Sequence, residues 1–145
     1  MKILKFTLIT FLAVVILFFA MALLLPSVNY IERSITIHAP VEKVYSSFSN
    51  IKEWNSVSLL QKDAAVKYFP DSIIQFERVN KDIGKTVYVT VKFSGNVDEA
   101  VVTLIYETPL PLVMRMMTSK IEETTVPLME ESLALQKKSI EAINQ

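Results

Sequence analysis

The sequence predicts an α+β fold of two layers, in which a curved antiparallel sheet packs on a long C-terminal helix, preceded by one N-terminal transmembrane helix. Three observations lead to this prediction. Residues 6–25 form an apolar run of twenty positions with no charge, glycine or proline. Between residues 34 and 107, several short segments alternate apolar and polar side chains, as half-buried strands do. From about residue 112, apolar residues recur at the spacing of an amphipathic helix instead.

The apolar run divides the chain into residues 1–26, a cytoplasmic tip and transmembrane anchor, and residues 27–145, a single domain. A helix of about twenty residues rises about 30 Å, which matches the hydrocarbon core of a bilayer. Lys2 and Lys5 precede the run, and the positive-inside tendency therefore places the N-terminus in the cytoplasm. We expect the chain to cross the cytoplasmic (inner) membrane once, with the domain outside.

A cleaved signal peptide is the alternative interpretation of the same run. Ala20-Met21-Ala22 has the small-x-small pattern that a signal peptidase accepts. The run continues through Leu25, however, and is longer than the usual core of a signal peptide, which favours an uncleaved anchor. Cleavage would leave the domain secreted or periplasmic, so both interpretations export it.

The composition excludes several classes of function. The chain has no cysteine, one histidine (His38) and two glycines (Gly84 and Gly95). Thiolate or multi-histidine metal sites, cysteine nucleophiles and Gly-rich phosphate loops are therefore excluded, and we expect no metal and no cofactor. The domain has thirteen of the fifteen basic residues against all fifteen acidic ones, a formal charge of −2. Because the basic residues are scattered, we expect no nucleic-acid surface.

The domain is predicted to begin with a strand, a tight turn and a helix. Ile35 and Ile37 alternate with polar neighbours until Ala39-Pro40 ends the strand. Pro40 suits the first position of a helix, where a missing N–H costs nothing. Apolar residues then recur at helical spacing at Val44, Tyr45, Phe48 and Ile51, and Trp54 lies near the expected end of the helix.

Four further strands are predicted before the C-terminal helix. Residues 72–79, 85–93 and 99–107 have strong strand signals, and the shorter run at 64–69 has a weaker one. Short loops join the strands, which favours antiparallel neighbours in a meander.

The C-terminal helix is predicted from about residue 112. Its apolar stripe is expected to comprise Val113, Met114, Met117, Ile121, Leu128, Met129, Leu135 and Ile140. Pro127 lacks a backbone N–H, so it should kink this helix or split it in two.

Two segments carry a resemblance to a known family. The first is "VNYIERSITIHAPVEKVYSSFSNIKEW", residues 28–54, and the second is "VPLMEESLALQKKSIE", residues 126–141. They resemble the first strand, Ala-Pro turn, helix and tryptophan, and the C-terminal helix, of the START-like or polyketide-cyclase superfamily, also called the SRPBCC or helix-grip fold. The likeness is to its bacterial members with an N-terminal membrane helix. Family members usually have more strands before the last helix than the four predicted here, so the chain resembles a shortened member.

The resemblance implies a cavity between the sheet and the last helix that holds an apolar or amphipathic small molecule. Candidate ligand contacts are Trp54, Phe76, Arg78, Val89, Val91, Leu104, Tyr106, Met114 and Met117. Arg78 shares a strand face with Ile74 and Phe76, so its guanidinium would meet a ligand carboxylate, pair with a glutamate or reach solvent at the strand end. For Trp54 and the methionines, the structural alternative is that they simply fill the core.

These observations predict a membrane-anchored extracytoplasmic domain that binds an apolar or lipid-like small molecule between its sheet and its C-terminal helix. The alternative is a non-catalytic protein-interaction module of the same fold with a filled core, able to form a homodimer through an exposed edge strand. No catalytic residue is predicted, and binding is favoured over catalysis. The pairs Glu122-Glu123 and Glu130-Glu131 are neighbours in sequence, so they point in different directions on a helix and form no carboxylate dyad.

Overall fold

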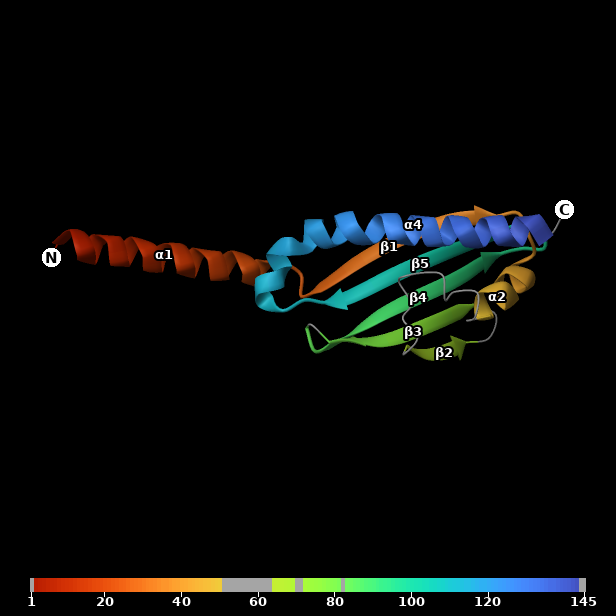
Figure 1. The fold of residues 1–145 in the computed structure, drawn as a ribbon, viewed down its shortest axis with the longest axis horizontal. Helices are drawn as coiled ribbons and strands as arrows, with labels where there is room; N and C mark the ends of the chain where they lie inside the picture. Colours follow the sequence, from red (N-terminus) through yellow and green to blue (C-terminus); the bar gives the residue numbers. More distant parts are fainter. Residues whose placement is uncertain (1, 51–63, 70–71, 82, 144–145) are drawn as a thin grey trace.

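A computed structural model describes residues 2–50, 64–69, 72–81 and 83–143 of the chain. Its elements are α1 (Lys2–Leu24), β1 (Val28–Ile37), α2 (Val41–Ser49), β2 (Ala65–Phe69), β3 (Ile73–Asn80), β4 (Lys85–Gly95), β5 (Ala100–Pro109), the 3-10 helix η1 (Leu112–Met117) and α4 (Thr118–Ile143). The molecule is elongated, with α1 projecting from one end of a two-layer α+β domain (Figure 1). This is the fold class that the sequence predicts.

The five strands form one antiparallel sheet in the order β1-β5-β4-β3-β2. Strands β2 to β5 are the predicted meander, including the weak strand signal at residues 64–69. At the β4–β5 hairpin, Gly95 has φ +145°, and a Cβ added there would lie 2.2 Å from the backbone oxygen of Glu99. The hairpin therefore requires glycine at this position.

Helix α2 closes the end of the domain that lies away from α1 (Figure 1). Its buried residues are Val44 and Phe48, two of the predicted set. The rings of Tyr45 and Phe48 each lie 5.3 Å from that of Phe93 on β4, edge to face. Pro40 is the N-cap of α2, one position before the predicted one. The predicted continuation to Ile51 and Trp54 lies outside the described residues.

Helix α4 lies along β1 and buries Met129, Leu133 and Ile140 in the core. The predicted stripe is wrong for Val113, Met117, Leu128 and Leu135, which are exposed. Val113 and Met117 belong to a 3-10 helix with about three residues per turn, so the α-helical period does not apply to them. Leu128 and Leu135 lie on α4 itself, beside the buried face of that helix and not within it. The buried side of α4 also includes three polar residues, Thr125, Ser132 and Gln136.

Pro127 lies inside α4, and the helix is not split there as one predicted alternative required. The proline is exposed, whereas Thr125 and Met129 on either side of it are buried. Packing against the sheet thus holds both halves in one helix despite the missing hydrogen bond.

Helix α1 is long and apolar enough from Ile3 to Leu24 to cross a membrane, by length and composition. A signal sequence would pass the same test. Its side chains are mostly exposed, but Ala22 is fully buried, because η1 packs against the last turns of α1. Only Leu25, Pro26 and Ser27 separate α1 from β1, so the domain follows the candidate span directly.

Candidate functional site

The candidate site is the inner face of the sheet, the face that carries the hydrophobic core and α4. The strand registers align two rows of side chains across all five strands on this face. The first row is Ile31, Tyr106, Val89, Phe76 and Val66, and the second is Arg33, Leu104, Val91, Ile74 and Tyr68. Most of these side chains are buried and belong to one apolar cluster.

Five of the nine predicted ligand contacts come together in these rows. Phe76, Val89 and Tyr106 are neighbours in the first row, and Val91 and Leu104 are neighbours in the second. Four of them are buried, and Tyr106 is partly buried against them. The period-2 pattern was sufficient to find them, because it fixes which residues of a strand share a face.

The other four predicted contacts lie elsewhere or cannot be placed. Arg78 is on the inner face opposite Val87, half-buried at the end of β3, and no carboxylate among the described residues pairs with it. Met114 and Met117 are on η1, whose main contacts are with α1 and α4, and Met117 is exposed. Trp54 lies outside the described residues.

Two polar residues on the inner face did not figure among the predicted contacts. Asn29 and Thr108 are paired across β1 and β5, with 2% and 5% of their surfaces exposed. Asn29 Nδ2 and Thr108 Oγ1 are buried, and neither has a hydrogen-bond partner in the described part of the chain. Leaving such an atom unpaired costs about 1–3 kcal/mol, so a ligand group that bonded to it would recover that free energy.

The alternation of residues in the sequence is enough to place Asn29 on the inner face. Asn29 alternates with Ile31, Arg33, Ile35 and Ile37, so the same period-2 argument assigns it to the inner face. It is not among the predicted contacts because the apolar residues Ile35 and Ile37 define the predicted strand, whereas β1 begins at Val28.

The inner face carries few titratable groups. In the described strands they are Arg33, Arg78, Lys85, Tyr68 and Tyr106, and no carboxylate or histidine occupies an inward position. Arg33 Nε lies 3.3 Å from Glu130 Oε1 of α4, but both side chains are largely exposed, so this ion pair contributes little. Within the described residues, no group of three His, Cys, Asp or Glu side chains could hold a metal ion.

Other charged contacts lie outside the inner face. Tyr30 Oη donates a hydrogen bond of 2.8 Å to Glu32 Oε2 on the opposite face of the sheet, which raises the pKa of Tyr30. Lys67 pairs with Glu77 on that face, and this raises the pKa of Lys67. His38 is exposed, with Nδ1 4.0 Å from Glu99 Oε2, as expected for a surface histidine. None of these groups converges on the two apolar rows.

No protein-family model matches the chain, and no curated protein matches it in sequence. Solved structures do match its fold. The di-domain ARO/CYC protein StfQ from the steffimycin biosynthetic pathway superposes with a TM-score of 0.61 at 11% identity, over 81% of this chain and 52% of that one. A second di-domain ARO/CYC protein, BexL, is matched over 50% of its length, so the chain spans about half the length of these two proteins.

Shorter proteins match over nearly their full length. A START superfamily protein from Mycobacterium smegmatis has a TM-score of 0.54 at 13% identity, over 79% of this chain and 98% of that one. A norcoclaurine synthase from Thalictrum, a point mutant in complex with a transition-state analogue, has a TM-score of 0.55 at 11% identity, over 81% and 97%. The fold is therefore the SRPBCC or START-like fold, as the sequence predicted. At these identities the likeness shows the fold alone.

Proposed function

We propose that this chain is a membrane-anchored extracytoplasmic domain that binds an apolar or lipid-like small molecule between its sheet and α4. The observation that carries the proposal is the pair of apolar rows on the inner face, which bring Phe76, Val89, Val91, Leu104 and Tyr106 together. Ligand sites of this kind are mostly apolar, with a few polar groups that fix orientation. The norcoclaurine synthase neighbour, solved with a transition-state analogue, supports the idea that this fold accommodates small organic molecules.

Burial of apolar surface would supply the binding free energy. At roughly 25 cal/mol per Å², a ligand that buries about 300 Å² of apolar surface gains about 7–8 kcal/mol before the costs of association. This corresponds to micromolar affinity or weaker. Tyr106, Arg78, Asn29 and Thr108 are the polar groups on the inner face that would orient the ligand. Met114 and Trp54 stay proposed as further contacts, whereas Met117, which is exposed on η1, is not kept as one.

Binding fits this face better than catalysis does. General acid–base chemistry needs converging groups whose pKa values lie near the working pH. The inward positions of the described strands carry two arginines, two tyrosines and one lysine, and no carboxylate or histidine, the groups that most often serve as general acid and base.

The orientation of the domain is part of the proposal. Lys2 and Lys5, in the first turn of α1 and ahead of the apolar run, support a cytoplasmic N-terminus and an external domain. Because the chain has no cysteine, a Val97→Cys chain carries one thiol, on the exposed β4–β5 loop. Labelling of intact cells by a membrane-impermeant maleimide is expected, and labelling only after lysis would contradict the orientation. The mass of the mature chain distinguishes the anchor from a cleaved signal peptide.

Native mass spectrometry on residues 27–145, expressed without the anchor, tests the binding proposal. We expect a monomer with added mass that solvent extraction identifies as an apolar or lipid-like compound. Leu104→Trp should lose the added mass, because an indole would fill the inner face. Val101→Trp, on the outer face of the same strand, is the matched control and should retain it. Thermal unfolding of both variants checks that each is folded.

One observation favours the alternative, a protein-interaction module. Phe76, Val89, Val91 and Leu104 are already buried by protein atoms, as in a filled core. In that case residues 27–145 would carry no added mass and would form a dimer whose population rises with concentration. The same spectra therefore separate the two functions.

A further inference from the structure

The short helix η1 presents an apolar surface directly beside the end of α1. Its exposed side chains are Val113, Met116 and Met117, which we call the apolar foot. Val113 has 62% of its surface exposed. Three exposed large apolar residues within one turn-rich segment of six are unusual for a surface that faces only water.

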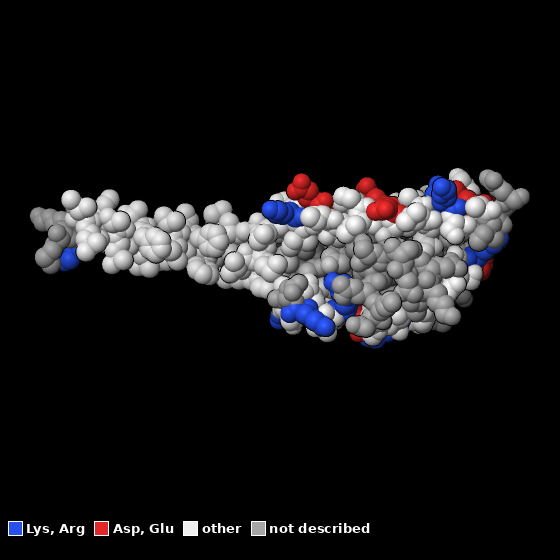
Figure 2. Space-filling model, in the orientation of Figure 1, with Lys and Arg blue, Asp and Glu red and all other residues white. Residues whose placement is uncertain are grey.

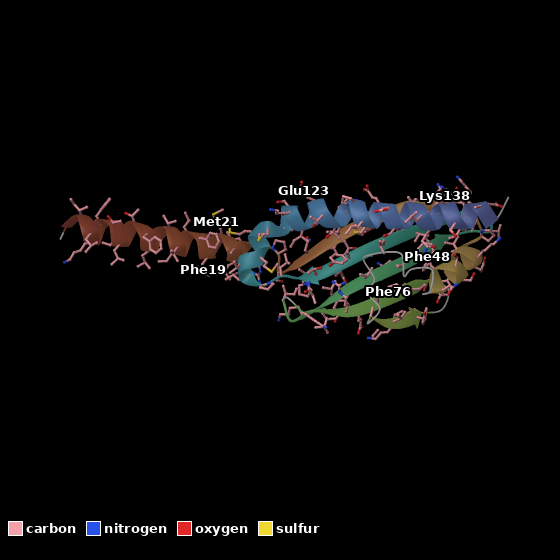
Figure 3. All side chains as sticks on the ribbon, in the orientation of Figure 1. Phe19, Met21, Phe48, Phe76, Glu123 and Lys138 are labelled. Atoms are coloured by element: carbon pink, nitrogen blue, oxygen red, sulfur yellow. The ribbon has the colours of Figure 1, made fainter. Side chains whose placement is uncertain are left out.

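The apolar foot continues the surface of the candidate membrane span. Helix η1 contacts the last turns of α1 and covers Ala22 completely, whereas Met21 and Leu23 on either side of Ala22 are exposed. Figure 3 labels Phe19 and Met21 on these last turns, next to η1. Figure 2 shows an uncharged surface along α1, from a basic group near its N-terminal end to the adjoining end of the domain, where the next charged groups appear.

The charge around η1 suits lipid headgroups. From Leu110 to Ile121 the chain has two basic residues, Arg115 and Lys120, and no acidic one. Arg115 Nε is buried, and no hydrogen-bond acceptor in the described part of the chain contacts it. No carboxylate among the described residues pairs with Arg115, and a guanidinium is suited to the phosphate of a lipid.

From these observations we propose that η1 inserts the apolar foot into the interface of the same bilayer that α1 crosses, with Arg115 at the level of the phosphates. The inference rests on the proposed membrane anchoring of α1 but not on ligand binding. An apolar segment of this kind lies in the boundary between headgroups and acyl chains without spanning the membrane. The domain would then touch the bilayer at two points, α1 and η1, and its orientation would be fixed.

Single-cysteine chains reconstituted in phosphatidylethanolamine–phosphatidylglycerol vesicles test this proposal. A Val113→Cys chain is labelled with the polarity-sensitive fluorophore NBD, and lipids with a bromine-labelled acyl chain serve as the quencher. We expect a blue-shifted emission and several-fold stronger quenching than in the control. The control is Val97→Cys, because Val97 has 70% of its surface exposed and lies on the hairpin at the far end of the domain.

A third chain, Val14→Cys, reports whether α1 itself is inserted. Quenching at position 14 but not at position 113 would overturn the apolar foot and leave the anchor intact. Quenching at none of the three positions would show that the anchoring proposal has failed. If η1 instead meets η1 of a second copy, oxidation of unlabelled Val113→Cys would give a disulfide-linked dimer and position 113 would escape the quencher. That outcome also overturns the proposal.

Discussion

At the scale of single residues, the inner face could be predicted wherever the side chain is apolar. Phe76, Val89, Val91 and Leu104 follow the period of two and are buried together. Asn29 and Thr108 follow the same period, yet they were missed because a polar residue at an inward position contradicts the hydrophobic pattern that defines a strand. Such exceptions are where function is expected, since a buried polar group without a partner is costly.

Thr108 provides a test of that cost. Its hydroxyl oxygen has no partner in the described residues, so we expect Thr108→Val to leave the free energy of unfolding unchanged or to raise it by about 1 kcal/mol. Thr90→Val is the matched control, because Thr90 Oγ1 accepts a hydrogen bond of 3.4 Å from Gln75 Nε2. We expect it to lower stability by about 1 kcal/mol. Urea denaturation of both variants measures the difference, and a larger loss for Thr108→Val would contradict the assignment.

The two glycines offer a second comparison. Gly95→Ala is expected to destabilise the chain strongly, because the added Cβ would lie 2.2 Å from the backbone oxygen of Glu99. Gly84→Ala should cost only about 1–2 kcal/mol, since φ is +60° there and nothing lies within 4 Å of the new Cβ. Thermal unfolding should therefore rank wild type above Gly84→Ala and Gly84→Ala above Gly95→Ala. Equal losses would mean that the hairpin relaxes around the new methyl group.

At the scale of elements, the existence and order of the strands could be predicted but the C-terminal helix only in part. The sequence predicts one amphipathic helix from about residue 112, whereas the chain forms the 3-10 helix η1 and then α4. The spacing of apolar residues in an α-helix does not show where a 3-10 helix, with fewer residues per turn, shifts the positions of the buried side chains. The predicted split of the helix at Pro127 is wrong, because packing of α4 on β1 outweighs the local preference of proline against helix.

Replacing Pro127 measures how much the proline lowers the free energy of unfolding. We expect Pro127→Ala to raise the free energy of unfolding by about 1–3 kcal/mol, because the backbone N–H of residue 127 can then bond to the carbonyl of Glu123. Ala134→Pro, at another exposed position of α4, should lower it by about 3 kcal/mol or more. Urea denaturation serves for both variants. A loss of stability in Pro127→Ala would show instead that a bend at the proline fits α4 to the sheet.

At the scale of the whole molecule, the sequence predicted two layers and an anchor but not how they are joined. The spacing of apolar residues indicates which face of a helix or strand is buried, but it does not indicate which other element packs on that face. The placement of β1 beside β5, and of η1 against α1, therefore became visible only in the structure. That second contact sets the inner face and its polar pair, Asn29 and Thr108, at a fixed orientation to α1, which is the proposed membrane anchor.

Lengthening the connection between α1 and β1 separates two reasons for this orientation. Only residues 25–27 join the elements, so α1 alone could hold η1 near the bilayer. Inserting a flexible Gly/Ser segment of about six residues after Pro26 removes that constraint. If the apolar foot binds lipid itself, the label at Val113→Cys should remain quenched in the lengthened chain. Adding Met116→Ser and Met117→Ser should then release it, since the remaining apolar area is too small to hold the segment in the interface.

The same two serine substitutions without the inserted segment are the control. There α1 still holds η1 close to the bilayer, so we expect only a partial loss of quenching at position 113. Release of the label by the insertion alone would mean that the short connection to α1, and not lipid, holds η1 near the bilayer. The domain would then have one attachment to the membrane, and the inner face would sample many orientations to the bilayer from which an apolar ligand would come.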